Sequence, residues 1–326
     1  GCVLANRLTE DGRSKVLLLE AGPPDKSMWI NIPAGFTKLL NSPIYNWNFE
    51  TEPEDNVAGR RIPIPRGRTL GGSSSINGML YVRGNPLDYN TWAQFGNRGW
   101  SYDSVLPYFK KSENFEGDSD DARGRGGPLN VADMRERHEL LDAFIDAAAS
   151  EGYPRNSDYN NGKQEGFGYY QVTQKNGERW STARAFLNPA KARQNLTIET
   201  DAYTTHVILD GKRAVGVGYT QHGVAKQARC GREVILSAGA VKSPQILELS
   251  AETGYGLGQS LTGTGLWMAP GGLAMMACAS ASAAVAARRG PKFCLVLGCA
   301  IITVGYLCGP LMLGSAALVC LLNVIV

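Results

Sequence analysis

The sequence predicts an α/β fold, and three observations lead to this prediction. A helical segment at residues 1–8 precedes an apolar strand at 16–19 that ends in an acid, Glu20. A glycine- and serine-rich stretch at residues 65–84 has the composition of a turn. Several apolar, strand-like runs then follow between residues 196 and 239. Helices that alternate with apolar strands indicate a layered sheet covered by helices.

The first 20 residues have the pattern of the second half of a βαβ unit. Apolar residues at positions 3, 4 and 8 recur at helical spacing, and Asp11-Gly12 closes the helix. In dinucleotide-binding folds a G-x-G-x-x-G turn opens such a helix, and an acid about 20 positions on binds ribose hydroxyls. Gly1 lies at the matching distance from Glu20, so we expect the first strand and two glycines to precede residue 1. The alternative is an unrelated helix–strand unit with an acid at the strand end.

The stretch at residues 65–84 has the order of a backbone nest. Gly71 and Gly72 remove two Cβ atoms in succession, and three serines follow. A turn of this kind exposes backbone N–H groups and enters a helix, which makes an anion site with phosphate as the expected anion. Arg66 and Arg68 add positive charge just before it. A Gly/Ser surface loop followed by a short helix is the alternative interpretation.

The other elements follow from composition and spacing. The proline- and aromatic-rich residues 23–64 predict an ordered excursion. Helices are expected at 105–109, 140–149 and 184–192, and strands at 166–174, 196–200, 206–209, 214–219 and 233–239. Asp210-Gly211 predicts a hairpin turn, and Ser243-Pro244 is expected to start a last helix.

Charge divides the chain into two unlike pieces. After Glu252 the only charged residues are Arg288, Arg289 and Lys292. Removing these three and Glu252 from the totals of 33 basic and 30 acidic residues leaves 30 and 29 for residues 1–251. This near-neutral balance argues against a nucleic-acid partner. Five of the seven cysteines lie after residue 252 and none forms a C-x-x-C pair, so we expect a reducing, cytoplasmic environment for residues 1–250.

The tail has the composition of a membrane segment. A spanning helix needs about 20 apolar residues, and residues 266–287 and 293–313 both reach that length, so we expect residues 260–326 to lie in a membrane. The basic loop at 288–292 predicts a cytoplasmic position. Together with the stretch at 267–272 it resembles a major-facilitator-type drug transporter; a generic membrane hairpin is the alternative.

Two motifs in residues 1–250 resemble the signatures of the glucose–methanol–choline (GMC) oxidoreductases, and the choline dehydrogenase-like branch looks nearest. The first signature reads Gly67-Arg-Thr-Leu-Gly-Gly-Ser-Ser-Ser-Ile-Asn77 and continues through Tyr81 to Asp88. The second begins at Ala238-Gly-Ala-Val-Lys-Ser-Pro-Gln-Ile-Leu247 and stops matching at Ser250. Since the family continues differently from this point, we expect a chimeric junction near Ser250.

The resemblance implies FAD as the cofactor and a Rossmann-like, three-layer domain that binds it. Gly1 resembles the last glycine facing the pyrophosphate, and Glu20 the acid on the adenosine ribose. The segment from Asn77 to Met79 resembles the part that lies along the flavin. The full set implied is Gly1, Glu20, Ala21, Gly22, Arg68, Gly71, Gly72, Ser75, Asn77, Gly78, Met79, Leu80, Thr204, Ala238 and Gly239.

The resemblance also implies the domain limits. The FAD-binding domain is expected at residues 1–110 and 182–250, incomplete at its N-terminus, and part of a substrate domain at 111–181. The chimeric helical tail is expected at 251–326.

The reaction of the family is hydride transfer from an alcohol carbon to the flavin, with an electron acceptor as second partner and no metal. A histidine near the family's C-terminus deprotonates the alcohol. His138, His206 and His222 do not stand in that position, so we assign no catalytic residue and expect an inactive fragment. The alternative function is a membrane-transport fragment that carries a non-catalytic nucleotide-binding relic.

Overall fold

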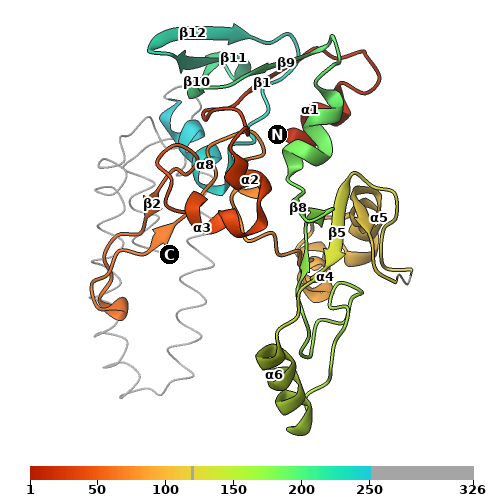
Figure 1. The fold of residues 1–326 in the computed structure, drawn as a ribbon. Helices are drawn as coiled ribbons and strands as arrows, with labels where there is room; N and C mark the ends of the chain where they lie inside the picture. The colour runs from red at the N-terminus through yellow and green to blue at the C-terminus, as the bar shows by residue number, and fades with distance from the viewer. Residues whose placement is uncertain (119–120, 251–326) are drawn as a thin grey trace, which may run out of the picture. The chain divides into compact units, whose positions relative to one another are not determined.

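The computed structural model describes residues 1–118 and 121–250 (Figure 1). The described chain divides between Tyr203 and Thr204 into two units. The predicted spanning segments, the transporter resemblance and the predicted tail domain at 251–326 all lie outside the described residues. Within residues 1–118 and 121–250, no helix combines the length and the apolar character needed to cross a bilayer.

The first unit is built around a parallel strand pair. Strand β1 (Val16–Leu19) lies beside β9 (Leu196–Glu199), with Val16 opposite Leu196 and Leu19 opposite Glu199. Helix α1 (Cys2–Leu8) packs beside a π-helical turn at Ala183–Leu187 and α7 (Asn188–Ala190), as the red and green segments of Figure 1 show. Parallel strands with a helix between them are the expected α/β arrangement. The predicted helix at 1–8 and the strands at 16–19 and 196–200 are therefore confirmed.

The core of this unit joins segments that are far apart in the sequence. Small and branched apolar side chains fill it: Ala5, Leu70, Ala183, Leu187, Ala190 and Leu196. Asn6 on α1 donates its Nδ2–H to the carbonyl of Phe186 at 2.7 Å. Because Leu70 belongs to this core, the glycine-rich stretch is packed against α1 and is not a loose surface loop.

Residues 23–64 form short elements in place of one long excursion. They are α2 (Met28–Asn31), α3 (Phe36–Leu39) and the antiparallel pair β2 (Phe49–Glu50) and β3 (Pro63–Ile64). Single 3₁₀ turns lie at Pro33–Gly35 and Asp55–Val57. Ile30 and Leu39 are buried with Ile76, so this segment packs against the middle of the glycine-rich stretch.

The remainder of the first unit holds helices α4 (Pro86–Gln94), α5 (Tyr102–Ser112) and α6 (Glu139–Ser150). Its strands are β4 (Glu113–Phe115), β5 (Leu129–Asp133), β6 (Gln171–Val172), β7 (Gln174–Lys175) and β8 (Glu178–Arg179). Strand β5 runs parallel to β4 and antiparallel to β6. The expected strand at 166–174 is thus reduced to two residues of β6 and the first residue of β7.

A buried ion network holds this region together. The Glu113 carboxylate is fully buried between Arg83, at 2.6 Å, and Arg123, at 2.7 Å. Arg123 also reaches Asp158 at 2.7 Å. Each buried charge therefore has an opposite charge in contact with it, which is the condition under which buried ions are tolerated.

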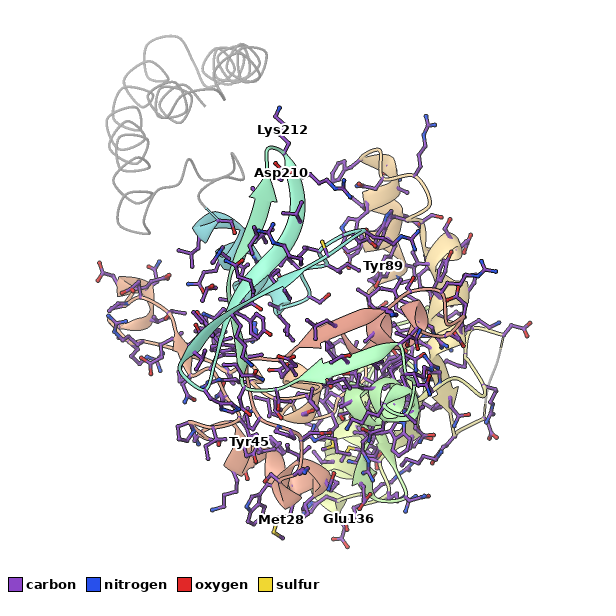
Figure 2. The ribbon with its side chains drawn as sticks, turned by 90° about the horizontal axis from the view of Figure 1, so that it is seen from above. Met28, Tyr45, Tyr89, Glu136, Asp210 and Lys212 are labelled. Atoms are coloured by element: carbon purple, nitrogen blue, oxygen red, sulfur yellow. The ribbon has the colours of Figure 1, made fainter. Side chains whose placement is uncertain are left out.

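The second unit contains all but the first two residues of an antiparallel meander of β10 (Ala202–Asp210), β11 (Arg213–Gln221) and β12 (Val224–Arg229). The hairpin expected at Asp210-Gly211 is present, and Gly211 takes the left-handed φ of +57° that such a turn requires. Figure 2 shows Asp210 and Lys212 at its tip. Helix α8 (Gly239–Leu249) is tied to β10 through Ser250, whose Oγ accepts from the N–H of Val207 at 2.9 Å.

Two predictions in the second unit are wrong. Residues 233–237 form no strand and are largely exposed, because no described strand lies beside them to complete a ladder. The last helix begins at Gly239 and not at Ser243-Pro244, so Pro244 lies inside α8. Proline is favoured in the first turn of a helix, which is why the sequence pointed to a start at Ser243-Pro244. In α8, Pro244 lies beyond the first turn and instead removes one intrahelical hydrogen bond.

Candidate cofactor-binding site

The acid at the end of β1 is locked into a tight turn. One carboxylate oxygen of Glu20 accepts a hydrogen bond from the N–H of Gly22 at 2.9 Å. The carbonyls of Glu20 and Gly22 accept from the N–H groups of Ala202 and Asp201, each at 2.9 Å. The chain at Glu20–Gly22 is therefore fixed by its own side chain and by the segment that follows β9.

The glycine-rich stretch crosses this turn at backbone distance. A Cβ on Gly22 would stand 1.9 Å from the carbonyl oxygen of Arg68 and 2.7 Å from the nitrogen of Thr69. The Thr69 hydroxyl donates to the carbonyl of Pro23 at 2.8 Å. The structure thus brings Glu20, Ala21 and Gly22 together with Arg68, as the resemblance implies.

The predicted turn at Gly71-Gly72 is present. Both glycines have left-handed backbones, with φ of +90° and +55°, a conformation that other residues rarely adopt. The Ser75 hydroxyl donates to the carbonyl of Leu70 at 2.7 Å and closes the turn from inside. The helix that follows is only a 3₁₀ turn, Gly72–Ser75, so the site depends on the glycine backbone and not on a long helix dipole.

The N-terminal end of α1 adjoins this turn. The Cys2 thiol is hydrogen-bonded to the backbone of Gly71 and to the Thr182 hydroxyl, although burial is the stronger influence and raises the pKa of the thiol. Gly1, immediately before Cys2, therefore lies close to Gly71. The two segments that the resemblance assigns to the pyrophosphate meet in the structure.

Thr182 is a site residue that the sequence alone did not indicate. Its hydroxyl lies 2.9 Å from that of Ser74 and 3.3 Å from the carbonyl of Gly71, and its N–H donates to the Ser74 hydroxyl at 3.0 Å. It joins the glycine turn to the helical segment at 183–190. A hydroxyl residue just before a predicted helix was the available signal, but it was equally compatible with an ordinary helix cap.

The charges at the turn are only partly satisfied. Burial raises the pKa of Glu20 to about 7, while the N–H of Gly22 and the charge of Arg68 oppose that rise. The Arg68 guanidinium lies over the Trp47 ring, 5.3 Å from its centroid. Its Nε is buried and has no hydrogen-bond partner in the part of the chain that the structure describes. A buried donor without an acceptor beside a glycine turn fits an anionic ligand.

The segment from Asn77 to Leu80 has an open face. Asn77, Gly78 and Leu80 are exposed, and a Cβ on Gly78 would meet no atom within 4 Å. The Asn77 side chain accepts from the N–H of Met79 at 3.0 Å. Met79 is buried and has a left-handed φ of +63°, which is uncommon for a non-glycine residue and is found at functional sites.

Arg179 is the second site residue that the sequence did not indicate. Its Nη1 donates to Asn77 Oδ1 at 2.8 Å, although 102 positions separate the two residues. Thr204, Ala238 and Gly239 belong to the second unit, and their part in the site stays a prediction. Among the described residues no cluster of three or more metal-binding side chains is found.

The three histidines have local contacts. His138 precedes α6 and accepts from the N–H of Leu140 at 3.2 Å. His206 lies on β10, with its Nδ1 2.9 Å from the hydroxyl oxygen of Thr205. His222 occupies the β11–β12 turn with a φ of +51°. Their assignment as structural or surface residues stays a prediction.

The fold and the site define the class of protein. It is an α/β domain in which a strand-end acid, a glycine turn and the start of a helix lie together, as they do in dinucleotide-binding folds. The comparisons define the family. The model of the GMC oxidoreductase family matches residues 24–262, so the chain belongs to the GMC oxidoreductases. The match extends 12 residues past Ser250, the expected junction.

Individual relatives agree with this assignment. The chain is 47% identical to mitochondrial choline dehydrogenase of Mus musculus over 77% of its own length and 43% of the relative's. It is 46% identical to the oxygen-dependent choline dehydrogenase of Vibrio vulnificus, over 77% and 45%. The chain therefore spans less than half the length of these curated relatives.

Solved structures show the same fold. Pyridoxine 4-oxidase from Mesorbium loti matches with a TM-score of 0.73 and 35% identity, over 77% of this chain and 50% of that one. An FAD-dependent oxidoreductase from Chaetomium thermophilum matches with a TM-score of 0.71 and 31% identity, over 77% and 46%. Family and neighbours indicate FAD as the cofactor, which the residues described above fit.

Proposed function

We propose that the protein is the FAD-binding part of an oxidoreductase that oxidises a primary alcohol of the choline type to an aldehyde. One observation carries the proposal: the Glu20–Gly22 turn, the glycine turn at Gly71-Gly72 and the start of α1 meet at one place in the first unit. The names of the relatives, choline dehydrogenases of Mus musculus and Vibrio vulnificus, support the substrate class.

Each part of the site has a task in holding FAD. The Glu20 carboxylate, which already accepts from the N–H of Gly22, can also accept from the ribose hydroxyls. The glycine turn lets the backbone approach the pyrophosphate, and Arg68 supplies positive charge beside it. The open face from Asn77 to Leu80 would receive the flavin. When bound, FAD supplies the hydride acceptor, and the chain supplies position and electrostatics.

Flavin content tests the proposal. The full chain is purified in a mild detergent, because its tail is apolar, and the visible spectrum is recorded before and after FAD is added. We expect about one FAD per chain, because a fold of this class has one dinucleotide site. A chain that folds and neither retains nor takes up FAD would overturn the proposal.

Substrate class is tested separately on the loaded protein. Anaerobic addition of choline bleaches the flavin absorbance if hydride transfer takes place, and glycerol serves as an alcohol without the quaternary ammonium group. The inactivity expected from the sequence stays a prediction that this measurement decides: bleaching by choline contradicts it. Bleaching by both alcohols at equal rates would refute the choline-type assignment.

A further inference from the structure

Arg179 is a buried cation with no carboxylate partner. The residue is fully buried, 0% exposed, at the end of β8. Among the described residues no aspartate or glutamate forms an ion pair with it. Burial accordingly lowers the pKa of the guanidinium to about 10. A charge in this condition is costly to the fold, so a fold that keeps it has a use for it.

Three of its hydrogen bonds converge on the flavin-facing segment and its support. The Nε–H donates to the carbonyl of Ile30 at 2.9 Å. The Nη1 donates to the carbonyl of Ser74 at 3.1 Å and to Asn77 Oδ1 at 2.8 Å. The guanidinium therefore holds both ends of the bend that leads from the glycine turn to Asn77.

Asn77 connects Arg179 to the left-handed turn at Met79 through hydrogen bonds. The oxygen that accepts from Arg179 also accepts from the N–H of Met79 at 3.0 Å. Met79 is held in its left-handed conformation by that bond and by Thr173, whose N–H donates to the Met79 carbonyl at 2.8 Å. Loss of Arg179 would remove one of the two hydrogen bonds to Asn77 Oδ1 and so weaken the restraint that Asn77 places on this backbone.

The Nη2 of Arg179 has no partner. It is buried and makes no hydrogen bond within residues 1–118 and 121–250. Arg123 is equally buried but has carboxylates on both of its terminal nitrogens, Glu113 and Asp158, each at 2.7 Å. Arg123 therefore has all its acceptors inside the chain. Arg179, beside the segment assigned to the flavin, is missing an acceptor for Nη2.

We infer that Arg179 is a positioning residue for the cofactor. It fixes Asn77 and the left-handed turn at Met79 in the conformation that receives FAD, and an oxygen of the bound FAD is the acceptor that Nη2 lacks. The inference rests on the proposed function, since it requires that this segment holds the flavin.

The test compares Arg179→Lys with Arg123→Lys in the full chain. Both changes keep a buried positive charge and lose the planar guanidinium with its five donors. Because Arg123 loses bonds to two carboxylates, R123K should destabilise the fold at least as much as R179K. FAD affinity is measured by quenching of flavin fluorescence, and stability by thermal unfolding without FAD. We expect R179K to weaken FAD binding about tenfold or more and R123K to change it less than about twofold. Equal affinities in the two variants would overturn the inference.

A double-mutant cycle tests the route through Asn77. Because Arg179 and Asn77 act as one unit, the loss of affinity in R179K combined with Asn77→Ala should be smaller than the product of the two single losses. A loss equal to that product would show independent roles and would reject the route. If wild-type protein binds no FAD, the proposed function and this inference fall together; if only the R179K effect is missing, the inference alone falls.

A second variant covers the case in which R179K does not fold. Asn77→Asp has the same shape and gives Arg179 a carboxylate, so the fold without FAD should be at least as stable as in wild type. The new ion pair would satisfy the guanidinium that FAD otherwise needs, and we expect FAD affinity to fall about tenfold. Wild-type affinity in N77D would overturn the inference.

Discussion

Substitution of Gly22 by alanine tests the close approach on which the site is built. The new Cβ would lie 1.9 Å from the Arg68 carbonyl oxygen, and a tolerable contact begins near 3.0 Å, so the two backbones must separate by about 1.1 Å. Neither side can yield easily, because Gly22 is bonded to Glu20 and Asp201, and Thr69 to Pro23.

The expected cost follows from that movement. Overpacking of this kind costs about 1–3 kcal/mol, and a hydrogen bond lost as the backbones part adds about 1 kcal/mol. The lower entropy of an unfolded alanine returns somewhat less than 1 kcal/mol. We expect a net destabilisation of about 2 kcal/mol, or a fall in Tm of about 4–8 °C for a protein of this size.

Thermal unfolding of the full chain without FAD measures this change. Gly231→Ala is the matched control, because its Cβ would meet no atom within 4 Å. G22A should also bind FAD more weakly at a temperature where it remains folded, since Glu20 and Arg68 move apart. A Tm for G22A within about 2 °C of the control would refute the reasoning, because the backbones could not then be in contact.

Three further predictions concern space and charge at other positions. In Gly78→Ala the new Cβ meets no atom of the described chain within 4 Å, so stability without FAD should stay within about 0.5 kcal/mol of wild type. If the flavin occupies that space, FAD affinity measured by fluorescence should fall about tenfold. Unchanged affinity would contradict this prediction. Burial raises the pKa of Glu20 to about 7, so the folded protein without FAD binds this proton more tightly than the unfolded chain. The resulting contribution to the free energy of unfolding is fully present below the unfolded pKa and is lost as pH rises through about 7. FAD needs the ionised form, so its affinity should fall as pH drops below about 7, and titrations of Glu20→Gln should lose that dependence; an equal slope in both proteins would exclude Glu20. Glu113→Gln leaves Arg83 and Arg123 buried without their shared anion and should cost about 3–5 kcal/mol in urea unfolding; a loss below about 1 kcal/mol would show that the network is dispensable.

Local patterns were sufficient for the elements that are stabilised by near neighbours. The spacing in residues 1–8, the apolar run at 16–19 and the Asp210-Gly211 turn each have a short-range cause, and each is present in the structure. The glycine turn at Gly71-Gly72 was predictable for the same reason, since a left-handed backbone at two successive positions selects glycine.

The features that sequence reasoning missed depend on distant partners. Arg179 binds groups that lie 149, 105 and 102 positions away, and nothing in its own neighbourhood indicates them. The run at 233–239 has strand composition, but a strand also needs a neighbouring ladder, and the described chain offers none. Composition therefore indicated which secondary structure these residues could form, but not which distant residues they would contact.

The parallel pairing of β1 with β9 has a consequence for synthesis of the protein. Val16 and Leu196 are adjacent in space but 180 residues apart in the sequence. At about 5–20 residues per second, a ribosome needs roughly 10–40 s to make the second strand after the first. During that time Glu20 has no fixed turn, because Ala202 and Asp201, which hold its carbonyl and that of Gly22, have not yet been made. FAD can therefore bind only late in synthesis. Until β9 leaves the ribosome, the apolar strand β1 is unpaired and open to aggregation.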